Sequence, residues 1–407
     1  MLSTPFVAIT LLLAVLAGCR PVEAARQDSC SFLVITVDGL RADHVGAYGA
    51  EPSSTPHLDK LAEESMRYAY ALAPAPWAAP SYAALWAGRY PSELGFTSLE
   101  RPLRGDVPTL AEAFGDAGWR TAAVTSHAFT DDSTGLDQGF QSWVELAGDA
   151  ATDREVTLAA TEQLESFGEE PFLLWVQYSG LRPPFDLPVP QSGYMGEIEP
   201  GQSRSELLRL APSLDEVDVE RLTDLYDAEL ARVDEEVGRL LAELRARRSG
   251  EQLVIVVSSP HGCELLEWGG VGDAATLRDE IVRVPLLLQV PGGRAGVIPD
   301  PVSLVDLVPT LRACAELGTD RAASGLCILP GHAAPERPIF SETSRVRELR
   351  AVLDGDWKLV VDKGRDEQQL FDVFHDPTEV KNAADTQGLM RDQLERHLHA
   401  FEAGLAE

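Results

Sequence analysis

Three polar side chains stand at or near the ends of predicted strands, where they could do chemistry. Asp38 and His261 each follow an apolar run, and Arg182 follows a third. In an open α/β sheet the carboxyl ends of the parallel strands form the binding edge, so we expect these side chains to lie near one another. A carboxylate and an imidazole hold metal ions or simply accept hydrogen bonds, whereas a guanidinium fork suits an oxyanion or stands in a solvent-facing loop. The pattern indicates a residual metal pair, Asp38 with His261, or an anion site at Arg182.

Alternating strands and helices must position these residues. Apolar runs typical of strands buried on both faces occur at 31–37, 121–125, 172–176 and 253–257. Helical patterns occur at 55–70, 81–87, 109–117 and 215–247. In the last of these, leucine and valine recur at three- and four-residue spacing, while acids and arginines fill the other face. We therefore predict the α/β class, with a doubly wound, mostly parallel sheet.

The pattern changes near the C-terminus. The elements expected there are a hairpin over 349–361, a strand over 370–373 and a helix over 389–405. We therefore expect a main α/β domain over 29–330 and a small C-terminal α+β subdomain over 335–407. Within the main domain, the segment 185–210 is rich in Pro, Gly and Ser and is predicted to be a lid or surface loop.

The N-terminus predicts export and lipid attachment. Its apolar stretch, Phe6–Ala17, has about half the length that a bilayer-spanning helix needs. It ends in Leu16-Ala17-Gly18-Cys19, which resembles the lipobox of bacterial lipoproteins, where the Cys thiol receives the lipid. We expect a signal peptide over 1–19, lipidation of Cys19, a tether over 20–28, and a lipid anchor in the bacterial outer membrane. The alternative is a plain cleaved signal with an incidental Cys.

The charge balance limits the kinds of molecule that the chain is expected to bind. Lys and Arg number 34 against 65 Asp and Glu, a net charge of −31. A balance this acidic repels nucleic acid and anionic membrane surfaces, and it also disfavours a polysulfated substrate. We therefore expect no nucleic-acid partner, membrane contact only through the lipid anchor, and an anionic small molecule or an envelope partner as the ligand.

Four cysteines follow Cys19, and an exported chain could pair them. Cys314 and Cys327 lie close in the sequence and flank a loop, so a bridge between them is the favoured pairing. Cys30 and Cys263 are expected at opposite ends of the sheet, and we predict that both stay free.

Several segments match, in the same order, the motifs of one enzyme family. They are Ile35–His44 (ITVDGLRADH), Ala75–Pro91 (APWAAPSYAALWAGRYP), Gly135–Phe140 (GLDQGF), His261–Gly262 and Trp357–Leu359 (WKL). With these motifs the chain resembles the sulfatases of the alkaline-phosphatase superfamily over essentially the whole mature chain. The resemblance implies an alkaline-phosphatase-like α/β fold and hydrolysis of sulfuric esters.

At the positions that carry the family's chemistry, the chain departs from the pattern. The family uses a Cys or Ser oxidised to formylglycine as nucleophile, and here that position falls on Ala78. The basic residue expected shortly afterwards is Tyr82. The family also holds a divalent cation, usually calcium, with paired carboxylates, and two of these acids are replaced by Gly39 and Pro260. Ser81 is the hydroxyl nearest to the lost nucleophile and could substitute for it or serve as a helix cap.

The remaining polar groups suit calcium poorly. Asp38 and His261 alone would be left as metal ligands, whereas calcium takes six to eight oxygens. Arg182 falls where the family has a His, and it adds a permanent positive charge. Asp273 falls where a basic residue is expected and would repel a sulfate if it faces the pocket. An anion pocket without metal, lined by Arg182 and Asp273, is therefore conceivable.

Three functions remain open from the sequence. The first is a non-catalytic member of the family that binds an anionic ligand or partner on the old active-site face. The second is a working hydrolase of sulfate or phosphate esters with a rearranged site. The third is a structural envelope protein whose pocket is filled by Trp77, Tyr82 and Trp86.

Overall fold

The computed structural model describes residues 30–98, 102–126, 134–146, 151–189, 193–273, 275–332 and 337–405. The predicted signal peptide, the lipidation site at Cys19 and the predicted tether lie outside these residues. Within them, no helix has the length and apolar character needed to cross a membrane.

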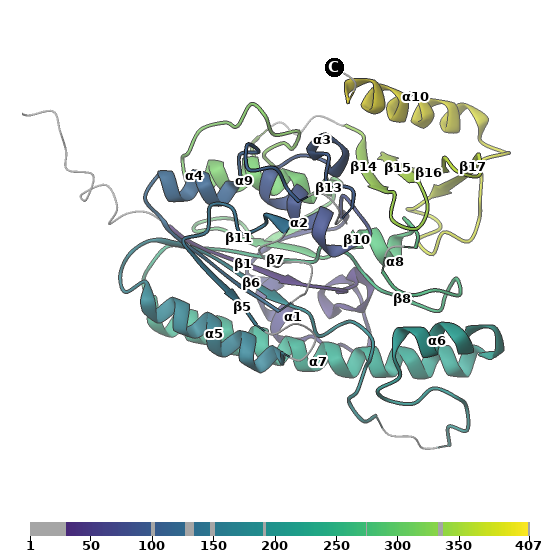
Figure 1. The fold of residues 1–407 in the computed structure, drawn as a ribbon, viewed down its shortest axis with the longest axis horizontal. Coiled ribbons are helices and arrows are strands. Elements are labelled where there is room, and N and C mark those ends of the chain that lie inside the picture. Colours follow the sequence, from purple (N-terminus) through teal and green to yellow (C-terminus); the bar gives the residue numbers. More distant parts are fainter. Residues whose placement is uncertain are drawn as a thin grey trace, which may run out of the picture.

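An eight-stranded sheet forms the centre of the molecule (Figure 1). Its strands, in spatial order, are β12 (Gly296–Ile298), β2 (Met66–Tyr68), β11 (Leu286–Gln289), β7 (Leu253–Ser258), β1 (Ser31–Val37), β6 (Phe172–Tyr178), β4 (Arg120–Thr125) and β5 (Ser142–Glu145). All neighbouring pairs are parallel except those that β11 makes with β7 and β2. The predicted doubly wound, mostly parallel sheet is confirmed.

Helices cover both faces of this sheet (Figure 1). They are α1 (Pro56–Glu63), α5 (Asp153–Ser166) and α7 (Glu216–Arg247) on one face, and α2 (Ala78–Ala87), α4 (Leu110–Asp116) and α9 (Leu307–Cys314) on the other. Alternate residues of β1 supply the two cores, because successive side chains of a strand point to opposite faces. Leu33 and Ile35 join the core under α1, α5 and α7, whereas Phe32 and Val34 join the core under α2.

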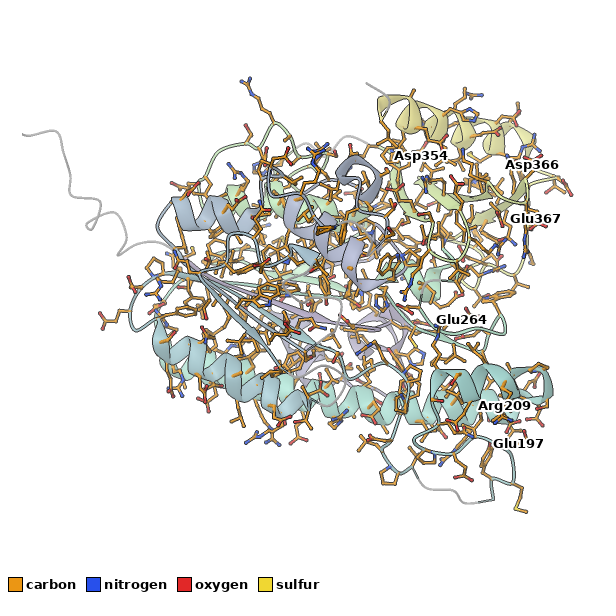
Figure 2. The ribbon with its side chains drawn as sticks, in the orientation of Figure 1. Glu197, Arg209, Glu264, Asp354, Asp366 and Glu367 are labelled. Atoms are coloured by element: carbon orange, nitrogen blue, oxygen red, sulfur yellow. The ribbon has the colours of Figure 1, made fainter. Side chains whose placement is uncertain are left out.

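A four-stranded antiparallel sheet forms the C-terminal part, with a helix on one face. Its elements are β14 (Ile339–Thr343), β15 (Leu349–Asp354), β16 (Trp357–Asp362), β17 (Glu367–Asp372) and α10 (Gly388–Gly404). The hairpin, strand and helix expected there are present. Acidic side chains such as Asp366 and Glu367 lie at its outer edge (Figure 2), in keeping with the negative charge.

Short elements complete the fold around the sheet edge and the loops. They are α3 (Pro91–Leu94), α6 (Arg204–Leu210), α8 (Asp279–Val282), the three-stranded sheet β10 (Arg283–Val284), β3 (Ala71–Leu72) and β13 (Val302–Ser303), and the pair β8 (Glu264–Leu265) and β9 (Val271–Gly272). The domain boundary predicted between 330 and 335 stays a prediction.

The structure corrects two sequence predictions. The helix predicted over 55–70 ends at Glu63, because the last part of that segment pairs with β11 and β12 as strand β2. The expected bridge between Cys314 and Cys327 is not formed, since the cysteines of the described residues are free thiols. Burial raises the pKa of the Cys314 thiol to about 12.

Candidate functional site

A cavity of about 180 Å³ opens at the carboxyl ends of β6 and β7 and beside the loop that follows β1. Its polar lining includes Arg182, His261 and Asp273, so the structure brings together three of the side chains singled out from the sequence. Two further arginines line it, Arg204 from α6 and Arg345 from the loop between β14 and β15. This cavity is called the cleft below.

Asp38 lies beneath the cleft and not in its lining. Its side chain is fully buried, and the Tyr82 hydroxyl donates a hydrogen bond to the Asp38 carboxylate. The Tyr82 oxygen also lies 3.1 Å from Oγ1 of Thr36, which in turn accepts a hydrogen bond of 2.8 Å from the indole of Trp175. Burial, reinforced by the charge of Asp38, raises the pKa of Tyr82 well above its usual value, so Tyr82 keeps the proton that it donates.

The nucleophile position and its neighbour lie on α2. Ala78 is the first residue of this helix and is buried, so a methyl group stands there. The Ser81 hydroxyl donates to the carbonyl of Ala75 at 2.8 Å and accepts from the amide of Ala75 at 3.2 Å. Because Ser81 is buried and satisfies both groups of Ala75, it fixes the start of α2 and does not face the cleft.

His261 lines the cleft, and one of its two ring nitrogens has no hydrogen-bond partner among the described residues. Its Nδ1 lies 2.7 Å from the carbonyl of Gly262, and its own carbonyl accepts from the amide of Gly39 at 3.1 Å. A carbonyl can only accept, so Nδ1 carries a proton and donates it. Nε2 is buried and has no hydrogen-bond partner among the described residues.

Three guanidinium groups give the cleft a positive lining. Arg345 forms an ion pair of 3.6 Å with Asp273 and lies 4.6 Å above the ring of Trp77. Arg204 donates from Nε to the carbonyl of Val271 at 2.6 Å and from Nη2 to the carbonyl of Asp273 at 3.1 Å. Since Asp273 is the carboxylate among the described lining residues, arginines outnumber acids there. The predicted repulsion of an anion by Asp273 is offset by Arg345.

Sequence reasoning missed Arg204 and Arg345. Arg204 belongs to the segment predicted as a lid or loop, which here contains α6, and Arg345 comes from the C-terminal sheet. Neither stands in a motif of its own, and only the tertiary fold brings them to the cleft. The one available signal was the predicted lid itself, since lids commonly close over binding sites.

The donor set does not fit calcium. Gly39 and Pro260 offer no side-chain oxygen, and the Asp38 carboxylate is already bound by Tyr82. Across the part of the chain that the structure describes, no three His, Cys, Asp or Glu side chains gather as a metal site would require. A hard cation that needs six to eight oxygens therefore lacks ligands here.

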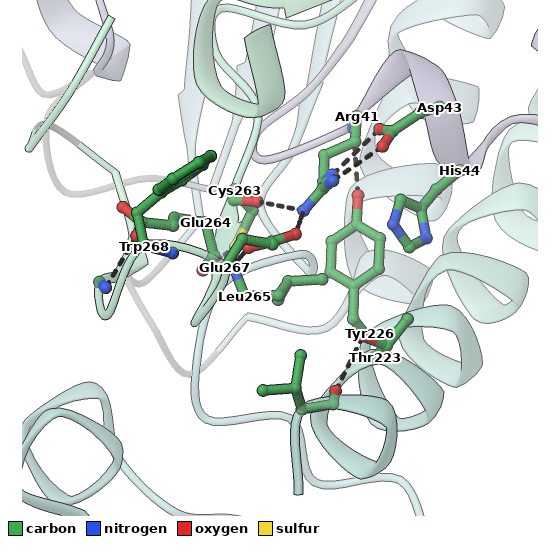
Figure 3. Close-up of polar contacts among 12 residues, drawn as sticks. Arg41, Asp43, His44, Thr223, Tyr226, Cys263, Glu264, Leu265, Glu267 and Trp268 are labelled. Carbon is green, nitrogen blue, oxygen red and sulfur yellow. Dashed lines mark hydrogen bonds and ion pairs between the residues drawn. The ribbon is translucent and has the colours of Figure 1, made fainter. Parts of the chain in front are cut away.

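A network around Arg41 holds the loop after β1 against the loop after β7 (Figure 3). The Arg41 guanidinium donates to Asp43 at 2.7 and 3.0 Å, to the carbonyl of Cys263 at 3.1 Å and to Glu267. Tyr226 accepts from the Arg41 amide at 3.1 Å and donates to the Gly39 carbonyl at 2.8 Å. These bonds fix the backbone on one side of the cleft.

The thiol of Cys263 is not a nucleophile at neutral pH. The residue is fully buried, and burial raises the pKa of its thiol to about 12. A buried, protonated thiol is inert, and Cys263 is free, as predicted.

Comparison with known proteins identifies what the chain resembles. The family model named Sulfatase matches residues 31–317. The chain is 25% identical to an uncharacterised sulfatase of Escherichia coli, with 87% of this chain and 83% of that protein covered. It is also 25% identical to a choline-sulfatase of Rhizobium meliloti, over 93% of this chain and 89% of that protein.

Solved structures show the same fold. A 2-O glycosaminoglycan sulfatase superposes with a TM-score of 0.74 at 20% identity, covering 93% of this chain and 92% of that one. A phosphonate monoester hydrolase of Agrobacterium radiobacter superposes with a TM-score of 0.75 at 18% identity, covering 92% of this chain and 96% of that one.

Proposed function

The chain belongs to the sulfatase family, and on that premise we propose that it is a non-catalytic member that binds a small anion in the cleft without a metal. The observation that carries the proposal is the hydrogen bond from Tyr82 to Asp38. A carboxylate that would face a cation is bound instead by a side chain of the protein itself. Ala78, at the position of the family nucleophile, supports the same conclusion because a methyl group cannot attack sulfur.

The lining of the cleft supports an anionic ligand. Arg182, Arg204 and Arg345 come from three separate segments and place three positive charges around about 180 Å³. This volume is large enough for one sulfate-sized group.

We expect sulfate to raise the unfolding midpoint of the full chain in a buffer that contains a calcium chelator. A ligand that binds only the native state at a hundred times its Kd stabilises that state by about 2.7 kcal/mol. Arg182→Ala should weaken sulfate binding by about 10- to 100-fold, because a hydrogen bond to a charged group is worth about 1.5–3 kcal/mol. Thermal unfolding against sulfate concentration, at constant ionic strength set with chloride, measures both effects.

The matched control is Arg294→Ala, which removes an exposed arginine outside the cleft. If Arg294→Ala lowers the response to sulfate as much as Arg182→Ala does, the effect is general screening and the anion site is not where we place it. If sulfate has no effect on the wild type, a structural protein with a filled pocket is the better account.

A rearranged hydrolase is the second candidate. Two observations favour it: His261 lines the cleft and has an Nε2 without a hydrogen-bond partner among the described residues, and named sulfatases are among the relatives. Turnover of an aryl sulfate or aryl phosphate that disappears in His261→Ala would establish this reading and exclude the first.

The cellular location is a separate proposal. We propose that the chain is exported and anchored to the bacterial envelope through a lipid on Cys19, on the strength of the lipobox-like sequence that ends there. Mass spectrometry of the N-terminal peptide after expression in a bacterium tests this. A lipid-modified Cys19 as the first residue supports it, and an unmodified Cys19 contradicts it.

A further inference from the structure

Asp273 places a hydrogen-bond acceptor among the positive groups of the cleft. The residue follows β9, and its side chain is 20% exposed and belongs to the lining. Nη1 of Arg345 lies 3.6 Å from Oδ2 of Asp273, which makes an ion pair but is longer than a hydrogen bond. Among the described residues, Arg204 donates to the backbone carbonyl of Asp273, and none donates a hydrogen bond to its carboxylate. The lone pairs of this carboxylate are therefore available to a ligand.

Contacts on two sides hold Asp273 at the cleft. The hydrogen bond of 3.1 Å from Arg204 fixes its backbone. Arg345 lies 4.6 Å above the ring of Trp77, which keeps the guanidinium beside the Asp273 carboxylate. Burial is the main cause of the raised pKa of the Cys263 thiol, and the charge of Asp273 adds to it. Since Cys263 also lines the cleft, the Asp273 carboxylate lies close to a second part of the lining.

A carboxylate in an anion site discriminates between oxyanions by the protons that they carry. Sulfate and sulfate esters carry no proton near neutral pH, so each of their oxygens repels a carboxylate oxygen. Inorganic phosphate keeps at least one proton under the same conditions, and it can donate this proton in a hydrogen bond to the carboxylate. Arginines bind either anion, and their charge alone favours sulfate, which is fully doubly charged. A preference for phosphate would therefore come from the carboxylate.

We propose that Asp273 makes the cleft selective for an oxyanion that carries a proton, a phosphate group, over a fully ionised sulfate group. The P–OH group donates to Asp273, while Arg182, Arg204 and Arg345 bind the other oxygens. Sulfate binds to the same arginines more weakly, because no proton lies between it and the carboxylate. This inference rests on the anion site proposed for the cleft, and it names the class of anion that the site prefers.

Calorimetry of the full chain with four anions tests the proposal. The anions are phosphate, arsenate, sulfate and selenate, at constant ionic strength set with chloride and with a calcium chelator present. Phosphate and arsenate carry a proton near neutral pH, whereas sulfate and selenate do not, so the two pairs separate the effect of the proton from that of size. We expect phosphate and arsenate to bind at least about tenfold more tightly, since a hydrogen bond to a charged group changes affinity by about 10- to 100-fold.

Asp273→Asn tests the residue itself. The amide is uncharged and no longer repels sulfate, so sulfate should bind more tightly and the preference for phosphate should fall to about threefold or less. Asp356→Asn is the matched control, because it removes an exposed carboxylate outside the cleft. This control should keep the preference of the wild type.

The proposal is overturned if the wild type binds sulfate as tightly as phosphate, or if it binds selenate as tightly as arsenate. It is also overturned if Asp273→Asn keeps the full preference for phosphate. In each of these cases an anion still binds, so the anion site itself stands. If none of the four anions binds, the anion site proposed for the cleft is wrong and its selectivity is excluded with it.

Discussion

Replacing Lys358 by methionine is expected to lower the free energy of unfolding by about 3–5 kcal/mol. Lys358 is fully buried on β16, and its ammonium lies 2.5 Å from Asp279 Oδ1 and 2.5 Å from Glu379 Oε1. Burial alone would lower the pKa of Lys358, but the two carboxylates hold it above its usual value. Methionine has a similar volume and no charge, so the variant leaves two carboxylates buried without their cation.

Urea unfolding at neutral pH measures this loss, and Lys363→Met is its control. Lys363 is partly exposed and pairs with Glu402 at 2.7 Å, so losing it should cost less than about 1 kcal/mol. Because Lys358 joins β16 to α8, the variant should also loosen the contact between the C-terminal sheet and the main domain. Equal losses of unfolding free energy in Lys358→Met and Lys363→Met would mean that the buried Lys358 contacts contribute no more than the surface ion pair of Lys363.

Tyr82→Phe should be the next most damaging change, at about 1.5–3 kcal/mol, the usual worth of a hydrogen bond to a charged group. It removes the donor that Asp38 receives from α2 in a fully buried position and leaves the ring in place. Tyr194→Phe removes the same kind of bond, a hydroxyl 2.6 Å from Asp218, from a partly exposed tyrosine. Asp218 keeps hydrogen bonds from the amides of Glu197 and Asp215, so the loss should be smaller. Urea unfolding compares the two variants.

Tyr82→Phe also tests whether Asp38 could serve as a calcium ligand. If a calcium site lay hidden behind Tyr82, removing the hydroxyl would free the carboxylate, and calcium would raise the unfolding midpoint of Tyr82→Phe. We expect no such rise, because Gly39 and Pro260 still supply no ligand. A calcium-dependent rise would contradict the account of the donor set.

The strands at the centre of the fold were predictable because each is buried on both faces. The runs that form β1, β6 and β7 are continuously apolar, so local sequence and tertiary position agree. Strand β2 was missed because its residues continue a helical pattern, and only its pairing with β11 makes it a strand. Local propensity is a weak guide where tertiary pairing decides.

The candidate site was predictable only in part for a similar reason. Arg182 and His261 come after strands that the sequence predicts. In a parallel sheet the ends of these strands lie at the same edge, so the two residues were expected to be close. Arg345 reaches the cleft from a loop of the C-terminal sheet. The hydrogen bond between Tyr82 and Asp38 joins a helix to the loop after β1, which is distant in sequence. Contacts between elements that are distant in the chain have no local signal.

The central claim is that the cleft binds a sulfate group without cleaving its ester. The most direct test is incubation of the full chain with 4-nitrophenyl sulfate at a concentration that raises its unfolding midpoint, followed by the absorbance of released nitrophenolate. We predict no release above that of His261→Ala, which serves to subtract contaminating sulfatase. Release by the wild type that is absent from His261→Ala would contradict the account and show that the cleft is a working hydrolase.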